Sequence, residues 1–580
     1  MTFTINKFLG INQAHDENSL KVGESTKMNN FVIKNKNLCI RDGIKIVKSF
    51  GENLAIQGAI KAKVYPQPHE RLFFVASGTL YEYDYSNDKV KTIGELDNFY
   101  ENPKIMMCAW SEKIYIITGT EYYCYDGKKL EITEGYVPML RTGVMPDGTG
   151  GVFVGERNLI SRYAIMSYIG DGESELYTLP VEAQEISYVK INGVETSDYT
   201  LTNNGAKVKI SNVPGTGDIV EIKFKGYTGH GRILIGNCVH GMTFGGSNDS
   251  CLFLWGDYVY PYRRYHSQVG DPTYFPENNY SDIGSKSGKI SDIVSQYDRQ
   301  IIFTDREIFY SVIDDSDALN ISFPVYSLNS SVGNKADAEV RIVNNNPVFL
   351  FGGVRELCSS NVRDEKNVRE IGARVEELSD INLENAITYD YEQNHEYYIS
   401  VGDKTYVYNY KEDVWYTLSG FTPVLYINIE DKLHFFDNKG NLCRFEKNQK
   451  YDICSDGQIK SIKASWEMPF YDFDEKAGKK FTNKAWVEIV PKSSTKFDIS
   501  FENNRGVKIC KKTLLVSQMD FTDLSFELFD FSLPRYNPIS LPIKCKGYQK
   551  IKIKLESDSA FTTACFSSVA INVNTAKRTK

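Results

Sequence analysis

The sequence offers few residues whose types and spacing could carry out a reaction. The densest carboxylate group, Asp314, Asp315 and Asp317, fits a solvated turn better than an acid–base pair, because charged residues are mostly exposed. A chain with 75 acidic residues always contains some pair that could resemble the two carboxylates of a glycosidase. No Gly-x-Ser-x-Gly nucleophile elbow and no repeated Ser-x-Asp-x-Gly-x-Thr-Trp box occurs. We therefore expect no enzymatic activity and assign no catalytic residue.

Metal and cofactor motifs are also missing from the sequence. None of the seven histidines forms a His-Glu-x-x-His or a short His-x-His pattern. The glycine-rich stretch 146–151 lacks the Gly-Lys-Ser/Thr ending of a phosphate-binding loop, so we interpret it as a surface loop. Residues 437–441 lack the spacing and terminal glutamate of a calcium-binding loop and fit a hairpin turn. We expect neither a metal nor a cofactor.

One aromatic stretch, residues 258–265, places four tyrosines beside two arginines. Such a cluster could stack on bases or sugars while its cations contact an anionic group. Tyr260, Tyr262, Arg263 and Arg264 are therefore candidates for channel or interface contacts. The alternative is that the aromatic side chains serve packing in a half-buried strand.

Composition and charge describe a packed globular protein. Hydrophobic residues make up 41% of the 580, and aromatic residues, mostly Tyr and Phe, make up 13%. The net charge of -8, with a pI near 5.6, argues against a general nucleic-acid-binding protein. We expect no signal peptide and no membrane-spanning segment, because no apolar run has the required length. The 11 scattered cysteines are odd in number and predict buried reduced thiols rather than a disulfide framework.

Paired short strands recur along the chain. An apolar strand, a turn and a strand with alternating aromatic residues begin near positions 71, 111, 251, 297, 347, 394 and 430. Most of these starts lie 36 to 50 residues apart, which is the period of a four-stranded propeller blade. The sequence therefore predicts an all-β fold with a β-propeller of about seven blades. An ordinary β-sandwich is the alternative.

Two regions interrupt this pattern. Strands expected near 187–191, 207–210 and 220–224 indicate a small β domain inserted in a blade, and long alternating strands after residue 456 indicate a C-terminal β-sandwich. Residues 366–379 have helical spacing and predict one short helix. The predicted organisation is an N-terminal extended arm with first strands (1–45), the propeller (46–156 and 229–455), the inserted domain (157–228) and the sandwich (456–580).

Several phrases, in this order, resemble a bacteriophage family of packaged-DNA stabilisation or tail-nozzle proteins. Near the N-terminus they are FLGIN at 8–12, GE at 23–24, MNNF at 28–31 and RDG at 41–43. Further along they are YVP at 136–138, PDGTGG at 146–151, NLIS at 158–161, GDPTYFPEN at 270–278, YNY at 408–410 and DVWY at 413–416. The resemblance covers roughly residues 8–420, and the C-terminal domain matches less clearly.

The resemblance implies a structural virion protein. Its copies would form a ring in the phage tail or neck below the portal and would line or seal the DNA exit channel. Its partners would be other copies of itself, portal or head–tail adaptor proteins, other tail proteins and passing genomic DNA, bound without sequence specificity. It would be assembled in the bacterial host cytoplasm. Two alternatives stay open, because a fold alone does not fix a function: a carbohydrate-binding or carbohydrate-cleaving propeller, and an intracellular protein-interaction propeller.

Overall fold

A computed structural model of the 580-residue chain provides the structure. It describes all residues except 52, 97–103, 227–229, 246–249, 287, 318–320, 360–366, 454–456, 474–477, 491–493, 505–507, 517–537 and 576–580. The chain divides into two compact units. Among the described residues, unit 1 lies within 1–55, 335–359 and 367–580, and unit 2 lies within 56–334.

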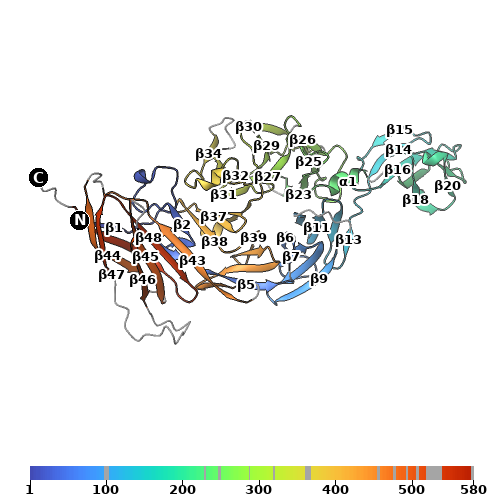
Figure 1. The fold of residues 1–580 in the computed structure, drawn as a ribbon. Helices are drawn as coiled ribbons and strands as arrows, with labels where there is room; N and C mark the ends of the chain where they lie inside the picture. The colour runs from blue at the N-terminus through green and yellow to red at the C-terminus, as the bar shows by residue number, and fades with distance from the viewer. Residues whose placement is uncertain are drawn as a thin grey trace. The chain divides into compact units, whose positions relative to one another are not determined.

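Seven four-stranded antiparallel arrangements confirm the predicted propeller blades (Figure 1). In unit 2 the blades are β6 (Ile56–Ala62), β7 (Arg71–Ala76), β8 (Thr79–Asp84) and β9 (Lys89–Glu95); β10 (Met106–Trp110), β11 (Lys113–Ile117), β12 (Tyr122–Tyr125) and β13 (Leu130–Ile132); β23 (His240–Phe244), β24 (Cys251–Trp255), β25 (Arg263–His266) and β26 (Tyr280–Asp282); and β27 (Ile290–Gln296), β28 (Arg299–Thr304), β29 (Ile308–Val312) and β30 (Val325–Asn329).

Unit 1 contributes the other three blades. They are β31 (Arg341–Val343), β32 (Asn346–Leu350), β33 (Val354–Leu357) and β34 (Val368–Glu370); β35 (Ile387–Tyr391), β36 (Glu396–Val401), β37 (Lys404–Asn409) and β38 (Val414–Ser419); and β39 (Pro423–Ile429), β40 (Lys432–Asp437), β41 (Asn441–Glu446) and β5 (Gly43–Ser49). In this last blade the outer strand comes from the N-terminal part of the chain, with Glu446 opposite Gly43 and Asn441 opposite Ser49. Strands far apart in the sequence thus complete one blade.

The blade sequences explain the packing. Within each unit the first strands of neighbouring blades contact one another, as β6, β10, β23 and β27 do in unit 2. The second strands are buried on both faces, which is why they appear in the sequence as continuous apolar runs such as β7 and β28. The recurrent apolar run followed by alternating aromatics is therefore the pattern of a blade's second and third strands.

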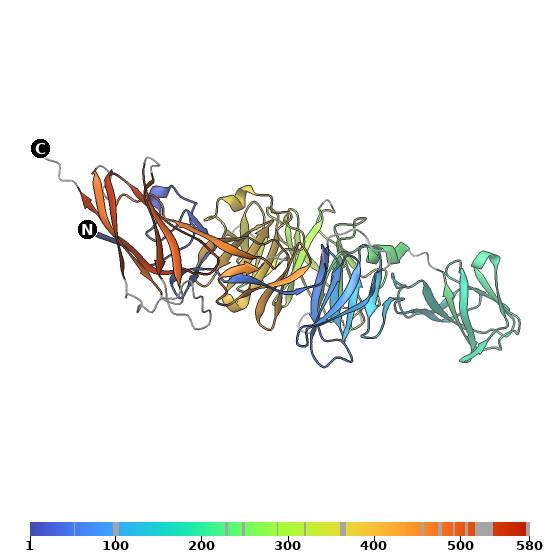
Figure 2. The same cartoon turned by 60° about the horizontal axis from the view of Figure 1, so that its bottom comes forward.

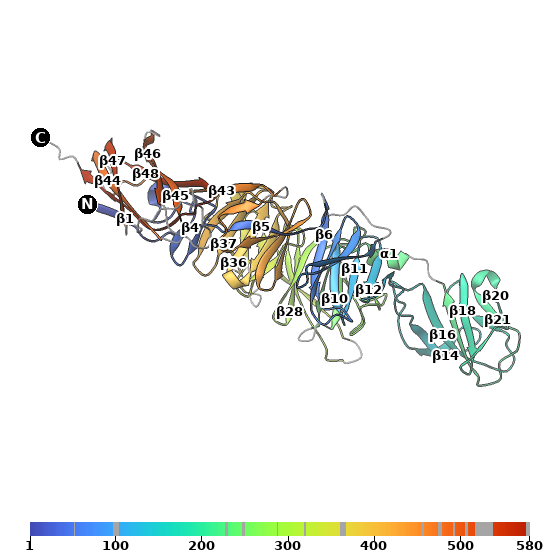
Figure 3. The same cartoon turned by 90° about the horizontal axis from the view of Figure 1, so that it is seen from below.

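The inserted domain begins earlier than the predicted residue 157. Its six-stranded sheet has the order β15-β14-β16-β22-β18-β19, and a three-stranded sheet has the order β17-β21-β20 (Figure 3). The strands are β14 (Met139–Val144), β15 (Gly150–Phe153), β16 (Tyr163–Ile169), β17 (Leu176–Thr178), β18 (Glu185–Ile191), β19 (Val194–Thr196), β20 (Tyr199–Thr202), β21 (Lys207–Ile210) and β22 (Ile219–Lys225). The glycine-rich stretch 146–151 is a loop only in its first part, because Gly150 and Gly151 already belong to β15, which pairs with β14.

The C-terminal β-sandwich is not built from residues 456–580 alone. One sheet joins β3, β4, β49, β44 and β47 in that order, with β1 on β49 and β50 on β44, and the other continues from β38 through β2 to β43, β48, β45 and β46. In Figure 2 the blue N-terminal strand lies beside the red C-terminal strands with which it pairs. The strands are β1 (Thr2–Ile5), β2 (Lys27–Asn29), β3 (Phe31–Lys34), β4 (Asn37–Ile40), β42 (Tyr451–Ile453), β43 (Ile459–Glu467), β44 (Lys480–Ile489), β45 (Thr495–Asn503), β46 (Lys508–Val516), β47 (Ile539–Tyr548), β48 (Ile551–Ser559), β49 (Cys565–Asn572) and β50 (Asn574–Thr575).

Two further expectations are corrected. The predicted helix at 366–379 is absent from the described residues 367–376, because Val368 pairs with Leu357 and completes a blade as β34. The described helices are α1 (His230–Gly236) and the single turn α2 (Glu377–Asp380). The expectation of reduced thiols fails at Cys39 and Cys565, which lie opposite each other on β4 and β49 and form a disulfide. Cys238 and Cys251 are buried free thiols, as expected.

Among the described residues, no helix is long and apolar enough to cross a membrane.

Candidate functional sites

The predicted aromatic and cationic cluster lies in the blade β23–β26. Tyr260 and Tyr262 belong to the connection between β24 and β25, and their rings lie 6.3 Å apart, edge to face. Arg263 begins β25, and its guanidinium carbon lies 3.7 Å from the ring centre of Tyr280 and 4.5 Å from that of Tyr260. The structure thus brings three of the four predicted residues together in one partly exposed cluster.

Arg263 is held in this cluster by charge as well as by stacking. Its Nε donates a 2.7 Å hydrogen bond to Asp282, and its Nη2 donates a second one of 3.2 Å. Lys286 adds an ion pair of 2.8 Å to the same carboxylate. Burial opposes the ionisation of Asp282, but the two cations outweigh it, so the pKa of this carboxyl is lowered. The cluster presents aromatic rings around a neutralised cation.

Arg264 does not belong to this surface, which corrects the expectation that it contacts a channel. The residue is fully buried, and its guanidinium donates hydrogen bonds to Gln300, to Ser311 at 3.3 Å and to the carbonyl oxygen of Phe323 at 3.1 Å. Burial lowers the pKa of Arg264 to about 9. The alternation of a strand explains the difference, since consecutive residues point to opposite faces. Arg264 links two neighbouring blades from inside.

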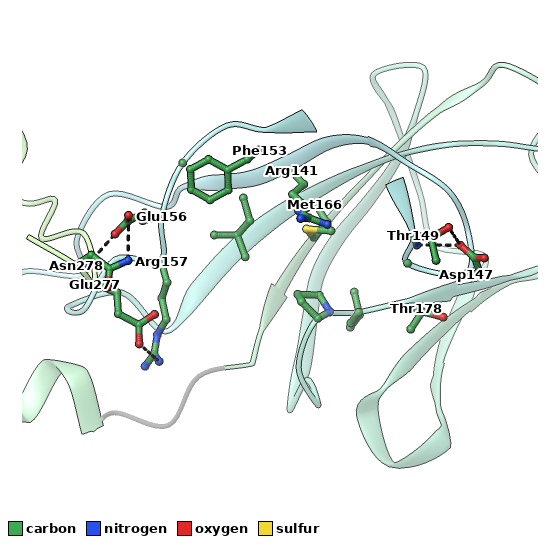
Figure 4. A pocket seen from close by; sticks show the side chains of 15 residues that line it. Arg141, Asp147, Thr149, Phe153, Glu156, Arg157, Met166, Thr178, Glu277 and Asn278 are labelled. Atoms are coloured by element: carbon green, nitrogen blue, oxygen red, sulfur yellow. Dashed lines mark hydrogen bonds and ion pairs between the residues drawn. The ribbon is translucent and has the colours of Figure 1, made fainter. Parts of the chain in front are cut away.

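A groove of about 590 Å³ lies in unit 2 beside the hairpin of β14 and β15 (Figure 4). Arg141, Phe153 and Met166 lie along it, with Asp147 at one end and Glu156 at the other. The polar groups at both ends are already bound: Asp147 accepts hydrogen bonds of 2.9 and 2.7 Å from Thr149, and Glu156 accepts bonds from Asn278. Sequence reasoning missed this groove, because its walls come from separate segments.

The carboxylates singled out in the sequence form no catalytic pair. Asp314 accepts hydrogen bonds from the backbone and hydroxyl of Ser316, which lower the pKa of this carboxyl, as in an exposed Asx turn. Burial raises the pKa of the Asp390 carboxyl to about 6, and the nearby negative charge of Glu392 contributes to the same shift. In the part of the chain that the structure describes, no group of three His, Cys, Asp or Glu side chains could hold a metal ion.

Several phrases quoted for the phage resemblance meet at one junction in unit 1. Gly10 has φ of +75°, and a Cβ there would lie 2.6 Å from the carbonyl oxygen of Trp415, so only glycine fits. The next residue, Ile11, donates its backbone N–H to that same oxygen at 2.8 Å. Asn12 donates a 3.0 Å hydrogen bond to Glu24, which also accepts one from the backbone of Lys21. The segments FLGIN and DVWY, about 400 residues apart in the sequence, are thus in direct contact.

Asn30 and Arg41 extend this junction from the blade β35–β38 to the sandwich. The Asn30 side chain accepts hydrogen bonds from Arg41 Nε at 3.0 Å and from the backbone of Ser419 at 2.9 Å, and it donates to the carbonyl oxygen of Lys463 at 2.8 Å. Arg41 binds Asp452 through two hydrogen bonds of 2.8 and 2.7 Å, and both side chains are buried. This network fixes strands of the propeller and the sandwich to one another within unit 1.

A second junction in unit 2 brings together the segments YVP at 136–138, NLIS at 158–161 and GDPTYFPEN at 270–278. The buried Asn158 donates hydrogen bonds of 2.8 Å to the carbonyl oxygens of Tyr136 and Thr273, and its own oxygen accepts one of 3.0 Å from Phe275. Tyr274 donates a 2.8 Å hydrogen bond to the carbonyl oxygen of Glu156. These bonds hold both ends of the inserted domain's first hairpin against the connection between β25 and β26.

No protein-family model and no curated protein matches the sequence. Among solved structures, the chain is similar to the mitotic checkpoint complex (7% identity over 70% of this chain and 96% of that chain, TM-score 0.33) and to BamB from Moraxella catarrhalis (10% identity over 68% and 98%, TM-score 0.32). It is also similar to YCF48 bound to D1 peptide (8% identity over 69% and 94%, TM-score 0.32). At these values the similarities carry no argument about function. The described strand order itself makes this chain a β-propeller protein.

Proposed function

We propose that this β-propeller protein is a structural component of a bacteriophage virion. Its copies form a ring in the tail or neck below the portal and line or seal the channel through which DNA leaves. It contacts other copies of itself, the portal or head–tail adaptor and other tail proteins, and it lets genomic DNA pass without reading its sequence. The protein is assembled in the host cytoplasm and works in the particle.

The convergence of the resembling phrases at two buried junctions is the observation that carries this proposal. Segments that matched by chance would have no reason to contact one another in the fold. Instead Gly10, Asn30, Arg41 and Asn158 occupy positions where their side chain, or its absence, is required by hydrogen bonds and close backbone contacts. A shared order of phrases at such positions supports a shared architecture, and that architecture belongs to a structural family.

The electrostatics of a conduit also favour this function. With a net charge of -8, the chain lacks the excess of cations that a tight phosphate-binding surface requires. A neutral or acidic wall repels the DNA backbone and allows the genome to slide. Arg263 fits this requirement, because Asp282 neutralises its charge.

We further propose that the protein has no hydrolase activity. The carboxylates of the groove and the Asp314 carboxylate in its exposed turn are already held by hydrogen bonds from neighbouring groups, which does not favour an acid–base role. Purified protein is expected to leave glycan, ester and phosphate substrates intact. Turnover that disappears when one carboxylate is replaced would contradict the structural function.

Particle composition and DNA affinity together test the proposal. Mass spectrometry of purified phage particles is expected to detect the chain in several copies per particle. Purified protein is expected to bind double-stranded DNA weakly at physiological salt and equally for unrelated sequences. Absence of the chain from particles, or tight binding of a monomer to one DNA sequence, would overturn the proposal.

A further inference from the structure

The strand β15 forms an exposed edge of the six-stranded sheet in the inserted domain. It pairs with β14 on one side, and no strand of the described chain pairs with its other side. All residues of β15 are exposed. The apolar side chains at its end and directly after it are more than half exposed: Val152 is 67% exposed, Phe153 61% and Val154 54%. An open backbone edge with exposed apolar side chains is a template for pairing with another strand.

Two outer strands of blades, β9 and β34, carry charged residues at their exposed positions. The exposed positions of β9 include Lys89 and Lys91, and those of β34 include Arg369 and Glu370. Charged residues on an edge strand disfavour association with a second sheet. The stretch 150–155 carries no charge and no proline. The edge of β15 therefore lacks the charges that β9 and β34 carry.

The opposite edge of the same sheet, β19, offers a matching surface. It pairs only with β18 in the described chain, and Val194 at its start is 71% exposed. Glu195 in its centre is exposed and forms no ion pair with any described residue. On the other side of the sheet, Arg141 lies directly opposite Phe153, is exposed, and likewise has no carboxylate partner among the described residues. Both edge strands thus carry exposed apolar residues, and the charges nearest to them, Arg141 on β14 beside one edge and Glu195 on the other edge, have opposite sign.

We propose that β15 of one copy pairs with β19 of the next copy, so that the sheets of the inserted domains continue from subunit to subunit. Contacts between two different edges are heterologous, and such contacts generate a ring when the rotation closes. Adjacent strands lie about 4.8 Å apart, so Arg141 and Glu195 of neighbouring copies would be separated by two strand spacings, within reach of their long side chains. This interface rests on the proposed ring function and identifies its contact surface.

Cysteine cross-linking tests the pairing directly. Cys358, an exposed free thiol, is first replaced by Ser, and Val152→Cys and Val194→Cys are then made separately in that background. Under mild oxidation an equal mixture of the two variants is expected to give disulfide-linked dimers, and the double variant a ladder of multimers. The two sites lie about five strand spacings, roughly 24 Å, apart within one sheet, so an intramolecular disulfide is excluded.

Each alternative outcome has a defined meaning. A mixture of Val152→Cys with Val213→Cys, an exposed valine outside both edges, is the control, and equal linking in that mixture would overturn the proposal. Linking of Val152→Cys with itself at the same rate would show a twofold contact through β15 and would also overturn it. Arg141→Glu and Glu195→Arg are each expected to reduce linking about fivefold, and their combination to restore it.

The same variants distinguish the interface from the proposed function. If particles contain a ring of this chain but the double variant does not link within them, the interface is wrong and the virion function stands. If particles contain no ring of this chain, the proposed virion function itself is wrong.

Discussion

Two adjacent arginines illustrate how much a side chain's role depends on the face of a strand. Arg263 stacks on tyrosines at the surface, whereas Arg264 is enclosed between two blades. We expect Arg264→Ala to lower the stability of unit 2 by about 3 kcal/mol, because it leaves buried acceptors without a donor. Arg263→Ala is expected to cost about 1 kcal/mol, since its ion pair is partly exposed. Thermal unfolding of the two variants measures the difference, and equal losses would contradict this assignment.

The buried imidazole of His266 gives a second prediction at this scale. Burial lowers its pKa from 6.5 to about 4, so the folded protein keeps this ring neutral at pH 5 while the unfolded chain protonates it. A depressed histidine pKa means that stability is present above pH 6.5 and is lost as the pH falls towards 4. His434 behaves in the same way. Asp390, with a pKa raised to about 6, acts in the opposite direction between pH 6 and 4.

Histidine C2 hydrogen–deuterium exchange, which depends on the protonation state of the ring, measures this directly. We expect His266 to show no titration between pH 7.5 and 5 in the folded protein, with the denatured chain as the reference. A His266 midpoint near 6.5 would contradict the enclosed position of this ring.

At the scale of elements, the propeller could be predicted but the sandwich boundaries could not. A blade is local in sequence: its strands follow one another with short turns, so apolar runs such as β28 and β36 recur at a readable spacing. The N-terminal strands β1 and β4 pair with β49, which lies more than 500 residues away in the sequence, and no local pattern encodes such a partner. The sequence predicts a helix over 366–379 where the strand β34 forms, because a strand of three residues is too short to show the alternation of apolar and polar residues.

Candidate sites could likewise be predicted only where their residues are close together in the sequence. The tyrosines and arginines of 258–265 could be found because they are adjacent in sequence, but the burial of Arg264 depends on Gln300 and Ser311 from the next blade. The groove and the two junctions depend on segments about 20 to 400 residues apart. The basic C-terminal residues Lys577, Arg578 and Lys580 lie outside the described residues.

The long-range pairing of the sandwich yields a prediction for a truncated chain. Residues 456–580 alone lack β1, β2, β3 and β4, so buried residues such as Phe566 and Ile571 lose their partners Leu38 and Phe3. We expect this fragment to unfold without a cooperative transition, because unpaired apolar strands cannot form both sheets. Circular dichroism melting, with the full chain as control, is the measurement. A sharp transition in the fragment would contradict the shared sandwich.

At the scale of the whole molecule, residues from the segments that resemble the phage family lie in two buried junctions, where their hydrogen bonds stabilise the fold. A mutation there is expected to affect assembly through folding. Asn158→Ala removes hydrogen bonds to three residues in two segments and is expected to lower stability by about 2 kcal/mol. Asn212→Ala, at an exposed position with one side-chain bond to Asp198, is expected to be nearly neutral. Proteolysis of the inserted domain measures both. A neutral Asn158→Ala would argue against the junction.

Imaging of purified phage particles tests the central claim most directly. Symmetric reconstruction of the portal-proximal tail should reveal several copies of a β-propeller around the portal axis, each with the inserted domain described above. Labelling the chain with an epitope tag at its C-terminus should add density to every copy in that ring. A ring made of another protein, or particles that contain no copy of this chain, would contradict the account.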